Sequence, residues 1–251
     1  MAATSNVFTA TLEQHFPGSI PEADFVSRTA QLLESEGFTR ENTIAAVAVC
    51  RDEIARPLFV DVEQRWGPTF SLASLAGMAT AGRTGLSAAL SHAPTDNGRK
   101  HLVVYAMPHI AIDRDGAIGQ VRRLGVSEPS SACGSLAALR ASLLGGHSQI
   151  GVDRFDSEQS LLSHRLQPLI GHGDVPDLAN LTKLAATAIE EDLSEIMEEV
   201  LSHPGDEAGS HPNGASFTGI QIHGPDDANY VWPRNALLVI DGIRRDIASE
   251  L

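Results

Sequence analysis

An unbroken apolar run from Ile44 to Val49 constrains the fold of this chain more than any other feature. A strand without alternating polar residues is buried on both faces, and such strands belong to parallel or mixed sheets whose faces are covered by helices. A second run of this kind extends from Leu102 to Ala106. Because helical patterns lie between and around these runs, the sequence predicts an α/β fold with a mixed, mostly parallel β-sheet flanked by helices.

Capping residues and apolar stripes indicate where the other elements lie. Ser19 and Pro21 favour the start of a helix that Gly37 ends, and a second helix ends at Gly67-Pro68. Two late strands and a hairpin with an Asp-Gly turn are also expected. The remaining predictions are helices over 136–144, 160–170 and within 174–202, strands over 217–223 and 237–241, and the hairpin over 110–119.

The domain organisation follows from length and from the absence of sequence breaks. A chain of 251 residues can form one large domain or two small ones. No internal repeat or linker divides this sequence. We therefore expect one domain over residues 1–251, in which residues 1–18 form a flexible or arm-like N-terminus.

The charge of the chain excludes some classes of partner. Its formal net charge is −14, whereas proteins that bind nucleic acid carry a basic patch. Negative charge also disfavours contact with anionic membranes. No apolar run approaches the roughly 18 residues of a membrane span, and the N-terminus lacks the pattern of a signal peptide. We expect a cytoplasmic protein that binds neither nucleic acid nor membranes.

The two cysteines lie at the ends of predicted elements. Cys50 directly follows the first buried run, and Cys133 precedes a helical run, where the helix dipole lowers a thiol pKa. Two cysteines do not form a disulfide framework. They could pair with each other, be unrelated buried thiols or bind a metal, and their neighbours must decide.

His109 suggests the metal-binding alternative, because it follows the second buried run. Two thiolates and one imidazole are a ligand set of catalytic zinc, which keeps its fourth position open and lowers the pKa of bound water to about 7. Asp52 and Arg56 are four residues apart, so they can face each other on a helical turn. The spacing contains no compact C-x-x-C motif, and two buried cysteines with a hydrogen-bonded histidine remain the alternative.

Several short blocks in a fixed order resemble one known family. Cys50-Arg51-Asp52-Glu53 with Arg56-Pro57-Leu58 is similar to the signature of the limiting-CO2-inducible protein B (LCIB) family, zinc carbonic anhydrases related in fold to the β class. The similarity spans roughly residues 35 to 245. The further blocks are Leu75-Ala76-Gly77, Ala81-Gly82 with Thr84-Gly85, Ser91-His92, Pro108-His109-Ile110-Ala111-Ile112, Asp115-Gly116 with Ile118-Gly119, Ser131-Ala132-Cys133-Gly134, Gln221-Ile222-His223 and Asp241-Gly242.

The resemblance implies a zinc-dependent carbonic anhydrase that reversibly hydrates CO2 to bicarbonate and a proton through zinc-bound hydroxide. It implies Cys50, His109 and Cys133 as Zn2+ ligands, and Asp52 with an arginine as the dyad that controls the fourth coordination site. We assign that arginine to Arg56; Arg51 and Arg83 are the rivals. The resemblance also implies a fold similar to β-class carbonic anhydrases and a homodimer, with CO2 and bicarbonate as the small-molecule partners.

The chain departs from the family pattern near the expected pocket. Met78-Ala79-Thr80 stands where an apolar, phenylalanine-containing loop is expected, and Ala93 follows His92 where a second histidine is common. These changes would alter the pocket wall rather than the ligands. Some relatives with intact ligands lack activity, so a zinc protein that binds bicarbonate or a partner subunit is the alternative. A different zinc hydrolase would need a roomier, polar pocket. His92 is expected to be a structural or surface histidine, with a role in the pocket as the alternative, and His147, His172 and His203 are expected to face solvent.

Overall fold

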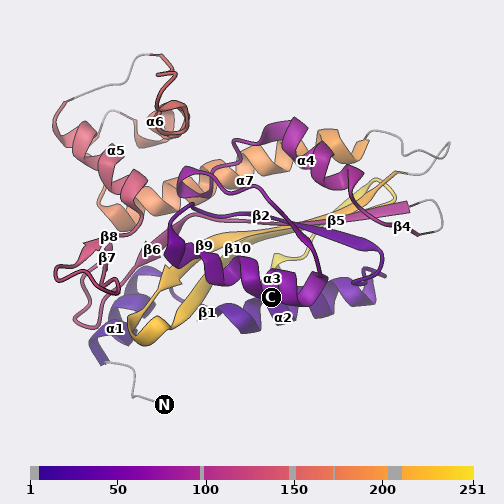
Figure 1. Cartoon of the computed structure of the whole chain (residues 1–251), viewed down its shortest axis with the longest axis horizontal. Coiled ribbons are helices and arrows are strands. Elements are labelled where there is room, and N and C mark those ends of the chain that lie inside the picture. The colour runs from indigo at the N-terminus through magenta and orange to yellow at the C-terminus, as the bar shows by residue number, and fades with distance from the viewer. Residues whose placement is uncertain (1–5, 97–98, 147–150, 172, 203–210) are drawn as a thin grey trace.

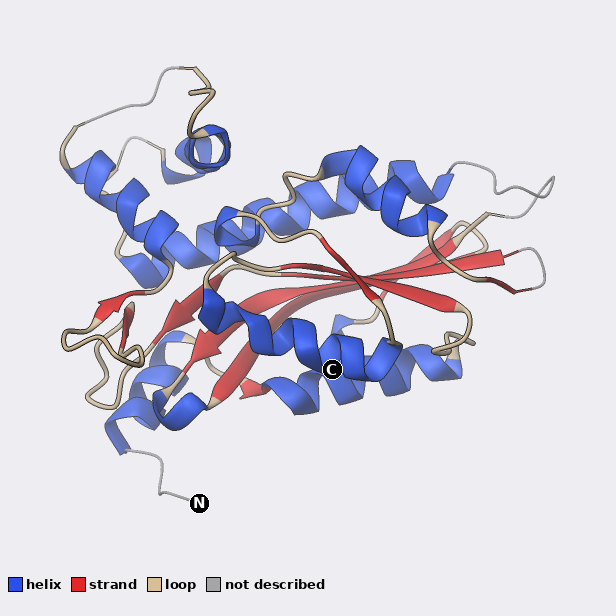
Figure 2. Cartoon of the chain, viewed as in Figure 1, coloured by secondary structure: helices blue, strands red, loops and turns tan. Residues whose placement is uncertain are grey.

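The protein is built around one mixed sheet with helices on both faces. The computed structural model describes residues 6–96, 99–146, 151–171, 173–202 and 211–251. Helices α2 (Glu22–Ser35) and α3 (Arg56–Trp66) cover one face, and α4 (Gly82–Ser91) and α7 (Leu178–Ser202) cover the other (Figure 1; Figure 2). This three-layer arrangement confirms the predicted fold class.

The order of the main strands is β1-β10-β9-β5-β2-β3. The pairs β2–β3, β2–β5 and β5–β9 are parallel, whereas β10 runs antiparallel to β9, β1 and β11. β2 and β9 are buried along their whole length, as the apolar run of β2 requires, although β9 also buries polar side chains. The strands of this sheet are β1 (Ile20–Pro21), β2 (Thr43–Ala48), β3 (Thr69–Ser71), β4 (Thr95–Asp96), β5 (Arg99–Ala106), β6 (His109–Ala111), β9 (Asn213–His223), β10 (Asn229–Ile240) and β11 (Ile243–Asp246).

The remaining elements lie at one end of the molecule. Helices α5 (Gly134–Leu144) and α6 (Ser157–Ile170) pack on α7, and α1 (Asn6–His15) lies near β6 (Figure 1). A small separate ribbon pairs β7 (Gln120–Val121) with β8 (Ser130–Ser131). These bounds match the predicted helices and the strand over 217–223 within a few residues, because each element carries its own apolar periodicity and end signals. The strand expected over 237–241 is only the end of β10, which begins eight residues earlier.

The N-terminal segment differs from the arm that we expected. Residues 6–15 form helix α1, and Phe8, Leu12 and Phe16, which directly follows the helix, are buried in a second hydrophobic cluster with Ile110. The physical reason is that these three residues are spaced four apart, which places them on one face of a helix. Residues 1–5 lie outside the described part of the chain.

The predicted hairpin over 110–119 is also different. β6 pairs in parallel with the end of β9, and only an isolated bridge joins Ile112 to Ile118 across the turn. The turn itself forms as expected, since Asp113 Oδ1 accepts from the backbone amides of Asp115 and Ala117 at 2.9 and 2.7 Å. The pairing of β6 with β9 holds His109 against the sheet rather than in a free loop.

One glycine shows why the stretch between β3 and α4 consists of small residues. Gly77 has φ +69°, and a Cβ atom there would lie 2.2 Å from the carbonyl oxygen of Met107. The turn therefore packs backbone against backbone beside the end of β5. Ser74, in the same stretch, forms a parallel bridge with Cys50. This close contact confirms tight packing as the role of Gly77 and brings the loop up to Cys50.

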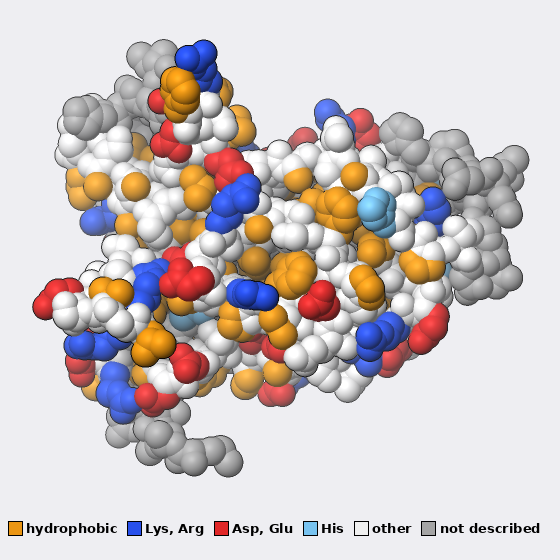
Figure 3. All heavy atoms as spheres, viewed as in Figure 1, with side chains coloured by type: hydrophobic (Ala, Val, Ile, Leu, Met, Phe, Trp, Pro, Cys, Tyr) orange, Lys and Arg blue, Asp and Glu red, His pale blue; other side chains and the backbone are white. Residues whose placement is uncertain are grey.

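Side chains of both charges share the visible surface. On the face seen in Figure 3, Lys and Arg side chains are scattered among acidic and hydrophobic ones and do not gather into one patch. No described helix combines the length and apolar composition that a bilayer crossing requires.

A buried carboxyl group joins α2 to the sheet. Glu22 is 3% exposed, and its Oε2 accepts a hydrogen bond from Gln221 Nε2 at 2.7 Å. Burial raises the pKa of Glu22 from 4.5 to about 8, because the charged form is desolvated. Gln221 Nε2 also donates to the carbonyl oxygen of Ala55 at 3.2 Å, which ties the start of α3 to β9.

Glu22 predicts a pH-dependent difference in stability. Because its folded pKa exceeds the unfolded value, stability is greatest below pH 4.5 and is lost as pH rises towards 8. Glu22→Gln has no carboxyl group to titrate at this position. Over this pH range the unfolding free energy of the parent should therefore fall by roughly a few kcal/mol relative to that of the variant. Urea denaturation of both proteins at several pH values measures the difference, and parallel pH profiles would contradict it.

Candidate metal centre

Three side chains from distant parts of the chain meet at the carboxyl edge of the sheet. The ligand atoms of Cys50, His109 and Cys133 all lie within 4.8 Å of one another, and the two Sγ atoms are 3.7 Å apart. Cys50 follows β2, and His109 begins β6 just beyond the end of β5. Because β2 and β5 are parallel neighbours, their carboxyl ends adjoin, which is where α/β sheets place their sites.

Cys133 is the third member of the set, and it comes from the start of a helix rather than the end of a strand. It is the N-cap residue of α5, as the sequence predicted. His109 and Cys133 are fully buried, and Cys50 is 7% exposed. The three predicted ligands are therefore brought together in a site that is shielded from water.

The hydrogen bonding of His109 shows that this cluster fits a metal ion. Its Nε2 atom is buried and has no hydrogen-bond partner among the described residues, although an orphaned polar atom of this kind is costly. Nδ1 of His109 makes a hydrogen bond with His223, so Nε2 is the ring nitrogen that remains to bind a metal. Two sulfur atoms and one imidazole nitrogen are the donors of a catalytic zinc site with an open fourth position.

The two thiols differ in acidity because they share a hydrogen bond. That bond from Cys50 lowers the pKa of Cys133, with smaller contributions from His109 and from Ser135, whose Oγ is 2.9 Å from the sulfur, although burial opposes the shift. The same bond, together with burial, raises the pKa of Cys50. The pair therefore favours a thiolate at Cys133 over one at Cys50, and metal binding would release the protons that the thiols keep.

Asp52 borders the three side chains. Its Oδ2 atom is 3.8 Å from Nε2 of His109. Nη2 of Arg123 donates to both carboxylate oxygens, at 2.8 Å to Oδ1 and 2.7 Å to Oδ2. The amide of Ile54 donates to Oδ1 at 3.4 Å. The carboxylate is thus held beside the cluster, with Oδ2 nearer to the histidine.

Arg123 is itself held by several acceptors. It lies in the loop that connects β7 to β8, beside β6 (Figure 1). Its Nε donates to Glu53 Oε1 at 2.6 Å, and its Nη1 donates to the carbonyl oxygen of Ser131 at 3.3 Å and to Ser130 Oγ. Because Arg123 is only 19% exposed, these contacts satisfy donors that water reaches poorly.

The structure corrects the predicted partner of Asp52, which is Arg123 rather than Arg56. Asp52 has extended backbone angles, φ −58° and ψ 133°, and caps the 3-10 turn Glu53–Ala55. Arg56 starts α3 and is exposed. The two residues therefore do not share a helical turn, and the four-residue spacing does not bring them together.

The two rival arginines point to other carboxylates. Arg51 Nη2 pairs with Glu158 Oε1 at 2.5 Å, and Arg83 pairs with Glu199 on α7. Arg123 was missed because it lies 71 residues from Asp52 in a loop without a recognisable motif. Only the folding of the β7–β8 ribbon brings it to the site.

His223 is a second residue that the sequence did not identify as part of the site. Its Nε2 atom lies 3.1 Å from Nδ1 of His109, and its Nδ1 lies 2.7 Å from Oδ1 of Asn229. Burial lowers the pKa of His223 to about 3. The sequence predicted a strand that ends at this histidine, and the β6–β9 pairing is what places it beside His109.

The other predicted positions lie away from the cluster. His92 is exposed, with its ring 5.6 Å from that of Phe70. Thr80 lines a pocket of ≈ 450 Å³ together with Arg51 and Phe70, and none of the three predicted ligands lines this pocket. His147, His172 and His203 lie outside the described residues.

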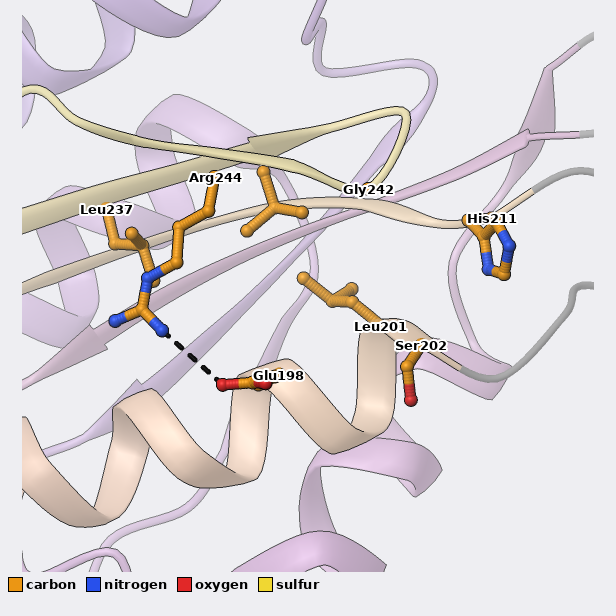
Figure 4. Close-up of a pocket in the computed structure, with 8 residues that line it drawn as sticks. Glu198, Leu201, Ser202, His211, Leu237, Gly242 and Arg244 are labelled. Carbon is orange, nitrogen blue, oxygen red and sulfur yellow. Dashed lines mark ion pairs between the residues drawn. The ribbon is translucent and has the colours of Figure 1, made fainter.

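Two further pockets lie at opposite ends of β9. One of ≈ 400 Å³ is bordered by His223, Arg114 and Arg122, close to the cluster. Another lies near the amino end of β9, where Arg244 faces Glu198 at 3.5 Å (Figure 4). It includes none of the three predicted ligands, since they lie beyond the carboxyl ends of the parallel strands.

Comparison with known proteins agrees with this geometry. A model of the limiting CO2-inducible proteins B/C, beta carbonic anhydrases, matches residues 19–240. The chain belongs to this family. The crystal structure of limiting CO2-inducible protein LCIB is 30% identical to this chain with a TM-score of 0.76, and the alignment covers 94% of this chain and 96% of LCIB.

The fold of this LCIB/C family member is also similar to that of a second solved structure. The crystal structure of PtLCIB4, a homolog of LCIB, is 24% identical with a TM-score of 0.82, covering 95% of this chain and 98% of PtLCIB4. A search of curated proteins found no match. The predicted resemblance and the carbonic anhydrase-like α/β fold are therefore confirmed.

The cluster predicts that Cys50 is needed to bind a divalent metal. Cys50→Ser replaces a thiolate with a weak hydroxyl donor, so its affinity should fall by more than the roughly 10- to 100-fold that loss of an outer-shell partner costs. Titration with Co2+, followed through its thiolate absorption, measures this. His92→Ala is the matched control because it removes an exposed histidine outside the cluster. Equal affinity of Cys50→Ser and the parent would contradict the assignment.

Proposed function

We propose that this LCIB/C family member is a zinc-dependent carbonic anhydrase that reversibly hydrates CO2 to bicarbonate and a proton. The observation that carries the proposal is the Asp52 carboxylate, which Arg123 holds beside the buried cluster. Family membership and the carbonic anhydrase-like fold support the choice of reaction.

Cys50, His109 and Cys133 would hold the zinc ion, as their donor atoms and burial suit it. Zinc with an open fourth position acts as a Lewis acid that makes hydroxide available from water near pH 7. The neighbouring chain groups must then orient the nucleophile and keep the site free of competing ligands.

Asp52 is suited to orient the attacking water or hydroxide. An ionised carboxylate only accepts hydrogen bonds, so it binds a proton of the nucleophile and leaves a lone pair for the carbon of CO2. Oδ2 is the atom for this task, because it lies 3.8 Å from His109 Nε2 and Oδ1 takes the additional amide bond of Ile54.

Arg123 would keep that carboxylate in place. A guanidinium is always charged, and its contacts with both oxygens oppose movement of Asp52 onto the metal. Glu53 and the Ser131 carbonyl oxygen hold Arg123 from its other side. The dyad of this protein is therefore Asp52 with Arg123.

A homodimer in the cytoplasm forms the remainder of this proposal. The homodimer is supported by the resemblance of the sequence blocks to the LCIB family and not by any contact within the chain, and the cytoplasmic location stays an expectation from the sequence. Light scattering measures the mass in solution, and a monomer at assay concentration would contradict the dimer.

Asp52→Ala should retain zinc but lose most of its activity. Removing a group that orients or transfers a proton typically costs 10²- to 10⁴-fold, and we expect a fall in kcat/KM within roughly that range. Stopped-flow CO2 hydration with matched zinc content measures the loss. Unchanged hydration by this variant would contradict the role of Asp52. No hydration by the fully metallated parent would instead indicate a zinc protein that binds bicarbonate or a partner subunit.

Arg123 and Arg56 provide a direct test of which arginine completes the dyad. Arg123→Leu leaves Asp52 without its charged partner, so hydration should fall by a factor comparable with that of Asp52→Ala. Arg56→Leu removes an exposed guanidinium and should leave hydration near the parent value. The same hydration assay, with zinc content measured for each protein, compares them. The reverse order of losses would restore Arg56 as the partner.

A further inference from the structure

The protonation of His109 decides whether it can bind a metal. A neutral imidazole carries one proton, and only the nitrogen without it has a lone pair for a metal ion. Nε2 of His109 is the atom near Asp52 and lacks a hydrogen-bond partner among the described residues. The proton must therefore reside on Nδ1 for His109 to act as a ligand.

Asn229 determines the direction of the hydrogen bonds that reach His109. Its Nδ2 donates to the carbonyl oxygen of Asp227 at 3.2 Å, which leaves Oδ1 facing Nδ1 of His223 at 2.7 Å. An amide oxygen can only accept a hydrogen bond. Nδ1 of His223 therefore carries the proton on that ring.

The next link follows from the burial of His223. The side chain is 4% exposed, and a charged imidazole at this depth would be desolvated. In the neutral ring with the proton on Nδ1, Nε2 has the lone pair and accepts. Its neighbour at 3.1 Å is Nδ1 of His109, which must then be the donor.

We propose that Asn229 and His223 form a relay that selects the Nδ1-protonated tautomer of His109 and aims the Nε2 lone pair at the two thiols. Both are positioning residues, since neither contributes a ligand atom and they act through His109. The inference rests on the proposed function only in taking His109 as a zinc ligand. It adds an outer pair of residues to which the sequence assigned no role at the site.

The two strands keep the relay in register. His223 is the last residue of β9 and Asn229 the first of β10, and they are partners in the antiparallel ladder. β6, which begins with His109, pairs with β9 on its other side. The three residues thus lie on three neighbouring strands, whose backbone hydrogen bonds fix the spacing between the side chains.

Zinc affinity of matched variants tests the relay without measuring activity. His223→Leu removes the acceptor at similar bulk and should weaken zinc binding by roughly 10- to 100-fold, the cost of losing an outer-shell partner. His223→Gln offers an amide oxygen at a similar reach and should recover most of that loss. Competition with a chelator of known affinity measures each protein.

His101→Leu is the control for loss of a buried histidine from the sheet. His101 is 7% exposed and lies at the amino end of β5, away from the cluster, so this variant should bind zinc like the parent. Unchanged affinity in His223→Leu would overturn the relay. An equal loss in His223→Gln and His223→Leu would also overturn it, because packing alone would then explain the effect.

Nitrogen NMR of the metal-free parent separates this inference from the proposed function. We expect His223 to be neutral with its proton on Nδ1, whether or not the protein binds zinc. A proton on Nε2 of His223 would overturn the relay, since that ring would then donate towards His109. Failure of the parent to bind zinc would contradict the proposed function, and the His223 spectrum would still decide the direction of the relay.

Discussion

The parallel pairing of β2, β5 and β9 is the constraint on which the rest of the site depends. It aligns the carboxyl ends of β2 and β5, so Cys50 follows one strand and His109 begins just beyond the other, and the pairing of β6 with the extended end of β9 adds His223. Buried backbone groups must keep their hydrogen bonds, so these strands cannot shift independently. The positions of the donor atoms are therefore determined by the sheet, and the loops add Asp52, Arg123 and Cys133 around them.

The contact between Asp52 and Arg123 has a different physical basis. A largely buried ion pair gains little net stability, because the desolvation of both charges offsets most of their attraction. Its consequence is positional: the carboxylate is held facing the cluster. Glu53 and Ser131 accept further hydrogen bonds from the guanidinium. These contacts reduce the cost of taking Arg123 out of water.

Much of the fold could be predicted because its signals are local. The apolar runs at Ile44–Val49 and Leu102–Ala106 form β2 and β5. Gly67 directly follows the end of α3, and Gly37 lies in the turn after α2, as expected. Helix α1 was also readable in principle, since Phe8, Leu12 and Phe16 repeat with helical spacing. The hairpin over 110–119 was not, because β9 offers β6 a better partner than its own turn does.

The sequence by itself determined the α/β class, the family, and the placement of Cys50, His109 and Cys133 at the ends of elements, because residue type and periodicity are encoded locally. Only the tertiary structure decided that Arg123 rather than Arg56 holds Asp52, and that His223 and Asn229 stand behind His109. These contacts join residues that are 71 and 114 positions apart. Strand order and the β7–β8 ribbon create that proximity, and no spacing within a single segment could show it.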